Sequence, residues 1–130
     1  MSIAVRFYSR SGNTKLVAEA IAKAADVAAI PVDAPGSEIE EPTDILFIGG
    51  ALYAYGLDKH LKEFLAALRK EHVKKAVVFS TSWISKHSVA LIKKALAENG
   101  IPVEEAFFHV RNKPSEQQLT EAEAFARKFL

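Results

Sequence analysis

The stretch Ile3-Ala4-Val5-Arg6-Phe7-Tyr8-Ser9-Arg10-Ser11-Gly12-Asn13-Thr14 decides the fold of this chain. Its first half is largely apolar, as in a buried strand, and its second half is a turn rich in hydroxyl groups. Residues 15–25 follow at once, and their apolar side chains recur at the spacing of one helix face. The first N–H groups of such a helix lack intrahelical partners, and the helix dipole is positive there. We therefore expect the turn to attract an anion, most suitably a phosphate.

The same alternation of strand-like and helix-like segments continues along the chain. Continuous apolar runs predict four further strands, in residues 27–32, 44–48, 76–79 and 101–110. Amphipathic spacing predicts three further helices, in residues 57–68, 89–96 and 115–129, and the last can open with a capping box from Ser115 to Gln118. Residues 33–43 hold two prolines and a glycine, so we expect a loop or one helical turn. This order predicts an α/β fold, a parallel sheet with helices on both faces.

Bulk properties narrow the functional classes. At 130 residues the chain has the length of one domain, so we expect a single domain over residues 1–130. A net charge of +1 gives no reason to expect nucleic acid or a membrane surface as partner. The chain has no cysteine, which excludes disulfides and thiolate chemistry, and its four histidines are scattered, so no metal site is expected. No apolar run reaches the ~20 residues of a membrane span and no signal peptide is visible, so we expect a cytoplasmic protein.

Ligands of an open parallel sheet bind beyond the carboxyl ends of its strands, where the strand order reverses. The segment at the first such end offers hydroxyl donors from Ser9, Ser11 and Thr14, while Gly12 lets the backbone come close and Asn13 can donate a side-chain hydrogen bond. Serine, threonine and asparagine are also the usual helix caps. A capping turn without a ligand is therefore the alternative interpretation.

Two later segments fall at the same edge. The segment Gly50-Ala51-Leu52-Tyr53-Ala54-Tyr55-Gly56 carries two tyrosines, which either stack on a planar ligand or only cover the sheet edge. Residues 80–88 begin with Ser80-Thr81-Ser82-Trp83 and hold the only tryptophan of the chain. That indole either forms a second wall for a planar ligand or packs into the core.

Over essentially its whole length the chain resembles the short-chain flavodoxins. Residues 9–14 are similar to that family's loop for the phosphate of flavin mononucleotide (FMN), and residues 48–56 resemble its loop after the third strand. Residues 80–83 occupy the place of its loop after the fourth strand. The resemblance implies a three-layer α/β/α sandwich with a five-stranded parallel sheet in the order 2-1-3-4-5.

The resemblance also implies a set of cofactor-binding residues for non-covalent FMN. The phosphate would be held by Ser9, Arg10, Ser11, Gly12, Asn13 and Thr14. The ring would stack on Tyr53 or Tyr55 on one side and on Trp83 on the other, with the backbone of Ala51 and Leu52 near its N5 edge. The remaining members of the implied set are Ala54, Gly56, Ser80, Thr81 and Ser82.

The function that the resemblance implies is electron transfer by a monomer that docks transiently on redox partner proteins. One alternative is an FMN-dependent oxidoreductase acting on a quinone or porphyrin-type substrate. Another is a module that keeps the fold and has lost FMN. The chain also departs from the acidic character of typical flavodoxins, because basic residues surround the expected flavin site: Arg10, Lys59, His60, Lys86 and His87. We therefore expect the second one-electron reduction of the flavin to occur at a less negative potential than in an acidic flavodoxin.

Overall fold

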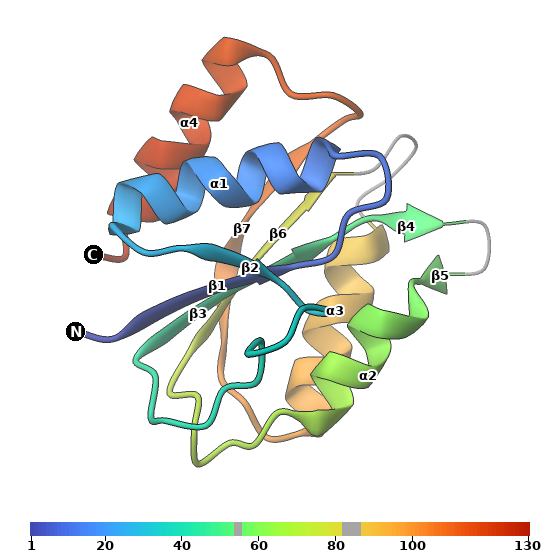
Figure 1. Cartoon of the computed structure of the whole chain (residues 1–130), viewed down its shortest axis with the longest axis vertical. Coiled ribbons are helices and arrows are strands. Elements are labelled where there is room, and N and C mark those ends of the chain that lie inside the picture. Colours follow the sequence, from blue (N-terminus) through green and yellow to red (C-terminus); the bar gives the residue numbers. More distant parts are fainter. Residues whose placement is uncertain (54–55, 82–86) are drawn as a thin grey trace.

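The computed structural model describes residues 1–53, 56–81 and 87–130 and is built around one five-stranded sheet (Figure 1). The strands are β1 (Ile3–Phe7), β2 (Ala29–Pro31), β3 (Ile45–Gly50), β6 (Ala76–Thr81) and β7 (Val103–Val110). All neighbours pair in parallel, in the order β2-β1-β3-β6-β7. Numbered among themselves, these five strands have the expected order 2-1-3-4-5, so that prediction is confirmed.

Helices cover both faces of the sheet and complete the three layers (Figure 1). One face carries α1 (Asn13–Ala25) and α4 (Glu116–Arg127), and the other carries α2 (Lys59–Ala67) and α3 (His87–Glu98). Strand residues alternate between the two cores because side chains of a strand point to opposite faces. In β3, Phe47 packs with the α1–α4 core, whereas Leu46 and Ile48 pack with the α2–α3 core. These side chains are fully buried.

Helix starts follow local sequence signals. Ser115 and Gln118 form the expected capping box, with each side chain accepting a hydrogen bond from the other residue's backbone N–H. Asp58 caps α2. The first helix begins at Asn13, two residues before the expected start, because the turn ends at Gly12 with φ +94°. Glycine adopts this left-handed conformation without the steric cost that a Cβ brings.

Residues 33–43 contain no helix, in keeping with the sequence, and run as a loop beside β1. The buried side chain of Arg6 on β1 fastens this loop, since its Nε donates a hydrogen bond of 2.7 Å to the carbonyl oxygen of Ser37. Among the described residues, no helix combines the length and apolar character that crossing a membrane requires.

Two segments expected as loops differ from that prediction. After β3, the chain forms an antiparallel pair, β4 (Leu52–Tyr53) with β5 (Gly56–Leu57), which projects from the carboxyl edge of the sheet (Figure 1). We call this pair the β4–β5 ribbon. The other difference is that Ser80 and Thr81 are the last residues of β6, where they continue the ladder with His109 and Val110 of β7. Strand pairing therefore extends further toward the expected site than apolar character alone indicates.

Candidate functional site

The carboxyl ends of four strands surround a pocket of about 140 Å³. Its lining includes six residues that the sequence singles out and one that it does not: Ser11, Asn13, Ala51, Leu52, Tyr53, Thr81 and Asn112. They come from the turn after β1, the β3–β4 connection, the end of β6 and the segment after β7. The three segments that the sequence places at this edge therefore do meet.

The turn after β1 has an open start of helix beside this pocket. The N–H of Gly12 donates a 2.9 Å hydrogen bond to Ser9 Oγ, and that of Asn13 lies 3.4 Å from Ser11 Oγ. No side chain caps α1, and its first turn holds no acidic residue. The hydroxyls of Ser9 and Ser11 thus accept hydrogen bonds within the turn, and the choice between a ligand site and a turn without a ligand stays a prediction. A helix start whose N-cap residue makes no side-chain hydrogen bond leaves further backbone N–H groups and positive potential available to an anion.

Thr14 has a structural contact where the resemblance implied a ligand contact. Its side chain is buried, and its Oγ1 lies 2.6 Å from Oγ1 of Thr81. Ser80, which is also buried, hydrogen-bonds through its hydroxyl to the hydroxyl of Ser88 in α3. These hydroxyl pairs join β6 to the starts of α1 and α3, and so fix the relative positions of the segments around the pocket.

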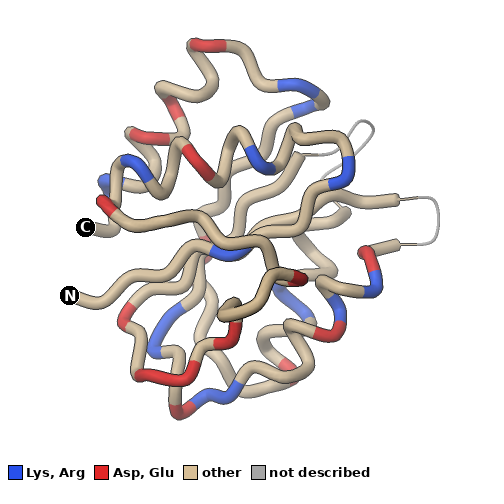
Figure 2. Tube along the Cα trace, in the orientation of Figure 1, with Lys and Arg blue, Asp and Glu red and all other residues tan. Residues whose placement is uncertain are grey.

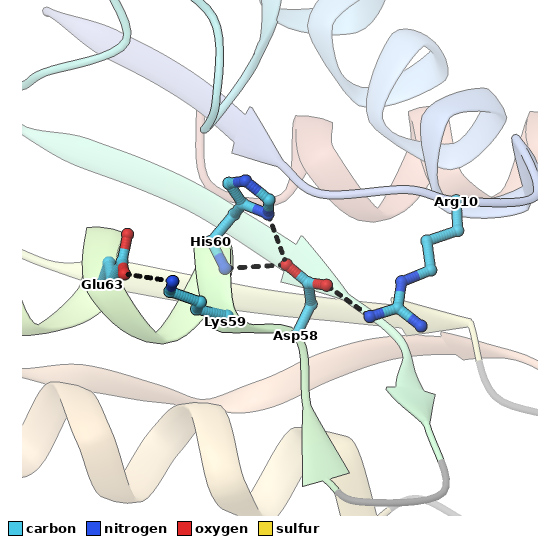
Figure 3. A network of polar contacts seen from close by, with 5 residues as sticks. All are labelled: Arg10, Asp58, Lys59, His60 and Glu63. Carbon is cyan, nitrogen blue, oxygen red and sulfur yellow. Dashed lines mark hydrogen bonds and ion pairs between the residues drawn. The ribbon is translucent and has the colours of Figure 1, made fainter.

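Arg10 belongs to a polar network on the α2 side of the turn (Figure 3). Its Nη2 lies 2.6 Å from Oδ2 of Asp58, and its guanidinium carbon lies 3.9 Å from the centre of the Tyr53 ring. The other carboxylate oxygen of Asp58 accepts hydrogen bonds from the backbone N–H of His60 at 2.7 Å and from Nδ1 of the same residue at 3.0 Å. The arginine thus links the turn after β1 to both α2 and the β4–β5 ribbon.

The electrostatics of this network fix its charge states. Burial by itself would raise the pKa of Asp58, but hydrogen bonds from Arg10 and His60 outweigh it and hold that pKa below its usual value. Burial raises the pKa of Tyr53, although a hydrogen bond from the Arg10 backbone and its charge act in the opposite direction. At neutral pH the network therefore holds a carboxylate, a guanidinium and a neutral phenol.

Asn112 and Asp58 are the residues that sequence reasoning missed. Asn112 follows β7, has φ +63° and lines the pocket. Asparagine tolerates this left-handed conformation better than most residues. Its position just after the carboxyl end of a strand is the one feature of the sequence from which a role at the site could have been predicted. Asp58 lies 48 residues from Arg10 in the chain, so no local pattern predicts their ion pair.

Several residues of the implied set do not line the pocket. Ser9, Arg10, Gly12 and Thr14 belong to the turn and the helix start but are not among the described lining residues, and the same is true of Gly56 and Ser80. Ala54, Tyr55, Ser82 and Trp83 lie outside the described residues, so the interpretation of Tyr55 and Trp83 as stacking residues stays a prediction.

Free basic charge lies around the pocket. Lys15, Arg111 and Lys113 are exposed neighbours of the lining residues Asn13 and Asn112, and none of the three pairs with a described carboxylate. Lys59 differs, since its Nζ lies 3.9 Å from Glu63 Oε1. The acidic positions of residues 38–44 lie toward the amino ends of the strands, away from the ribbon (Figure 2). Within the described part of the chain, no three His, Asp or Glu side chains gather to hold a metal ion.

We compared the chain with a family model, with curated proteins and with solved structures. A family model of the flavodoxin domain matches residues 4–123. No curated protein matches. Among solved structures, oxidised flavodoxin 1 from Bacillus cereus has a TM-score of 0.81 at 22% identity and covers 99% of this chain and 97% of that one. An archaeal flavodoxin has a TM-score of 0.77 at 22% identity, covering 98% and 95%. Rubredoxin oxygen:oxidoreductase from Desulfovibrio gigas has a TM-score of 0.81 at 17% identity, covering 96% of this chain but 34% of that one.

Proposed function

This chain belongs to the flavodoxin domain family, and from that premise we propose that it binds FMN and carries electrons between redox proteins. Membership implies a flavin cofactor. The observation that carries the proposal of FMN is the uncapped start of α1 beside the pocket, because a helix start of this kind favours an anionic group on the ligand. Among common flavins, FMN has a terminal phosphate and riboflavin does not.

The residues around the pocket fit part of this cofactor. Gly12 has φ +94°, and a Cβ added there would meet nothing within 4 Å, so the space on that side of Gly12 is open. The pocket of about 140 Å³ is smaller than the roughly 300 Å³ at the lower end for drug-sized ligands. The described residues would therefore hold the phosphate and one side of the ring. Residues 54–55 and 82–86 are the adjoining segments that lie outside the described residues.

Each group of residues has a separate role in this proposal. Ser11, Asn13 and the first N–H groups of α1 would bind the phosphate, with a helix dipole oriented to favour its negative charge. Tyr53 would border the ring, and the backbone at Ala51 and Leu52 would lie along its edge. The bound flavin supplies the redox chemistry, while the protein orients it and tunes its potential through contacts and nearby charge.

A carrier is favoured over a substrate-converting enzyme by the dimensions of the chain. This chain covers 97% of the Bacillus cereus flavodoxin and 95% of the archaeal flavodoxin. It therefore has the size of these flavodoxins and carries no long insertion relative to them. An enzyme acting on a quinone or porphyrin-type substrate requires a second cavity over the ring. We further propose that redox partners dock transiently at the carboxyl edge of the sheet, where the flavin would lie.

The test compares protein and small-molecule acceptors. FMN-loaded protein is reduced anaerobically with one equivalent of dithionite, so that no reductant is left over, and is mixed with cytochrome c; in a separate assay the oxidised protein is mixed with a quinone and NADPH. The proposal predicts reduction of up to two cytochrome c molecules for each bound flavin, because the reduced flavin holds two electrons, and a quinone turnover no faster than that of free FMN. Saturable quinone turnover well above free FMN would instead identify an oxidoreductase. Protein that fails to take up FMN, with no absorbance band near ~450 nm, would identify a module without the cofactor.

A further inference from the structure

Arg10 is the residue of the turn after β1 (residues 9–12) that the proposed function leaves without a role. It lies in the turn, where a cation could pair directly with a phosphate. Its side chain instead extends toward the start of α2, where it makes the 2.6 Å contact with Asp58 (Figure 3). The neighbouring residue Ser11 lines the pocket, and Arg10 does not.

The carboxylate that holds Arg10 is itself firmly placed. The Asp58 side chain is 5% exposed, caps α2 and accepts two hydrogen bonds from His60. The His60 ring stacks on Tyr8, with ring centres 5.1 Å apart and planes 12° from parallel. Tyr8 directly follows β1 and precedes the turn, so the anchor of Arg10 is tied to the sheet as well as to α2.

Tyr53 contacts both this network and the pocket. Its ring centre lies 3.9 Å from the guanidinium carbon of Arg10, and the residue also lines the pocket. The interaction between a guanidinium and the face of an aromatic ring is attractive. It therefore opposes rotation of that ring away from the guanidinium. Tyr53 belongs to a two-residue strand of the projecting ribbon, where it pairs with Gly56 of β5.

We propose, on the basis of the proposed function, that Arg10 is a positioning residue for the flavin ring and not a ligand of the flavin phosphate. The Asp58 carboxylate holds the guanidinium against Tyr53, and the guanidinium holds the tyrosine ring in place as a wall of the pocket. A wall that is ordered before the ligand arrives lowers the entropy cost of binding.

The test uses FMN and riboflavin, which share the ring and differ in the phosphate. Dissociation constants for both are measured by flavin fluorescence with wild-type protein, Arg10→Gln and Ser11→Ala. We expect Arg10→Gln to weaken both flavins by the same factor, roughly two- to thirtyfold. Ser11→Ala is the matched control, and it should weaken FMN more than riboflavin. An Arg10→Gln variant that weakens FMN alone, or neither flavin, would overturn the inference.

A second readout reports directly on the ring. The visible circular dichroism of bound FMN depends on the surroundings of the isoalloxazine, so it should change in Arg10→Gln at saturating FMN. It should be unaltered in Ser11→Ala. Where riboflavin binds too weakly to measure, this spectrum decides, and an unaltered band in Arg10→Gln overturns the inference.

Two conservative variants separate positioning from general stability. Asp58→Asn keeps a side chain that caps helices well but removes the charge that holds Arg10, so it should weaken both flavins equally. Arg10→Lys keeps the charge and loses the planar stack, so it should recover part of the affinity lost in Arg10→Gln. If wild-type protein binds neither flavin, the proposed function fails. If wild-type protein binds FMN and Asp58→Asn leaves both the affinities and the dichroism unaltered, only the role of Arg10 fails.

Discussion

The hydroxyl oxygens of Thr14 and Thr81 lie 2.6 Å apart in the interior, where the first turn of α1 meets the end of β6. These residues are 1% and 2% exposed, so each hydroxyl depends mainly on the other as its partner. A buried polar group that loses its partner is costly, whereas removing both partners together costs little. This contact therefore joins the turn after β1 to the strand end opposite it.

The first prediction concerns the loss of one or of both hydroxyls of the Thr14–Thr81 pair. Thr14→Val or Thr81→Val alone should lower the free energy of unfolding by about 1–3 kcal/mol, because one hydroxyl stays buried and unpaired. The double variant should recover most of the loss. Urea unfolding of the apoprotein measures all three. Thr120→Val, at an exposed hydroxyl bonded to the Glu116 carbonyl, is the control and should change stability by less than about 0.5 kcal/mol. Additive losses in the double variant would contradict the account.

The second prediction concerns Gly12. Gly12→Ala should cost about 1–2 kcal/mol of stability, because φ +94° is unfavourable for any residue with a Cβ. It should also weaken FMN binding at least about tenfold, since the backbone that faces the phosphate is displaced.

Gly36 supplies a matched control. It has φ +83°, and a Cβ added there would likewise meet nothing within 4 Å, but it lies in the 33–43 loop away from the pocket. Gly36→Ala should lose similar stability and keep wild-type FMN affinity, as judged by urea unfolding and fluorescence titration. Equal FMN affinities for the two variants would contradict binding of the FMN phosphate beside Gly12.

The third prediction is a pH dependence of stability. The folded pKa of Asp58 lies below its unfolded value of 3.8. The group therefore stabilises the fold above the unfolded pKa, and that contribution disappears as the pH falls through the folded pKa. Asp58→Asn should be less stable than wild type by about 1–2 kcal/mol at pH 7, and the difference should shrink below about pH 4.

Urea unfolding between pH 3 and pH 7 measures this difference. Glu63→Gln is the control, since its pair with Lys59 is exposed and should contribute no more than about 0.5 kcal/mol at any pH. A stability gap between wild type and Asp58→Asn that widens in acid would show that the sign assigned to Asp58 is wrong.

The fourth prediction concerns the potential of the bound flavin. Cationic charge near the ring stabilises the anionic reduced cofactor, so charge reversal at Arg111→Glu or Lys113→Glu should make the second one-electron potential more negative. Coulomb's law gives a shift on the order of tens of millivolts for each charge reversed at moderate distance in water.

Anaerobic spectroelectrochemistry at low ionic strength measures these shifts. They should shrink in 0.5 M salt, where exposed charges are screened. Lys70→Glu, which precedes β6 at the opposite end of the sheet, is the control and should leave the potential unaltered. An equal shift in Lys70→Glu would show that net charge, and not the position of the charge, sets the potential.

Much of the fold could be predicted because it depends on patterns that repeat over several turns or residue pairs. The buried runs 45–48 and 76–79 are apolar on both faces, as a central parallel strand requires, and the helices show one apolar stripe each. The β4–β5 ribbon was not predicted, because a strand of two residues is too short to show a period.

The site could be predicted at the level of segments and less well at the level of side chains. Topology brings the carboxyl ends of parallel strands together, so Ser11, Ala51 and Thr81 meet as expected. Which way a side chain turns depends on distant partners. Thr14 turns inward because Thr81 is there, and Arg10 turns toward α2 because Asp58 is there.

The most direct measurement of the central claim is a titration of FMN with the apoprotein, followed by flavin fluorescence. The account predicts saturable quenching at one FMN for each chain, with competition by inorganic phosphate because the start of α1 binds the phosphate group. Fluorescence that stays constant with protein in large excess would contradict it.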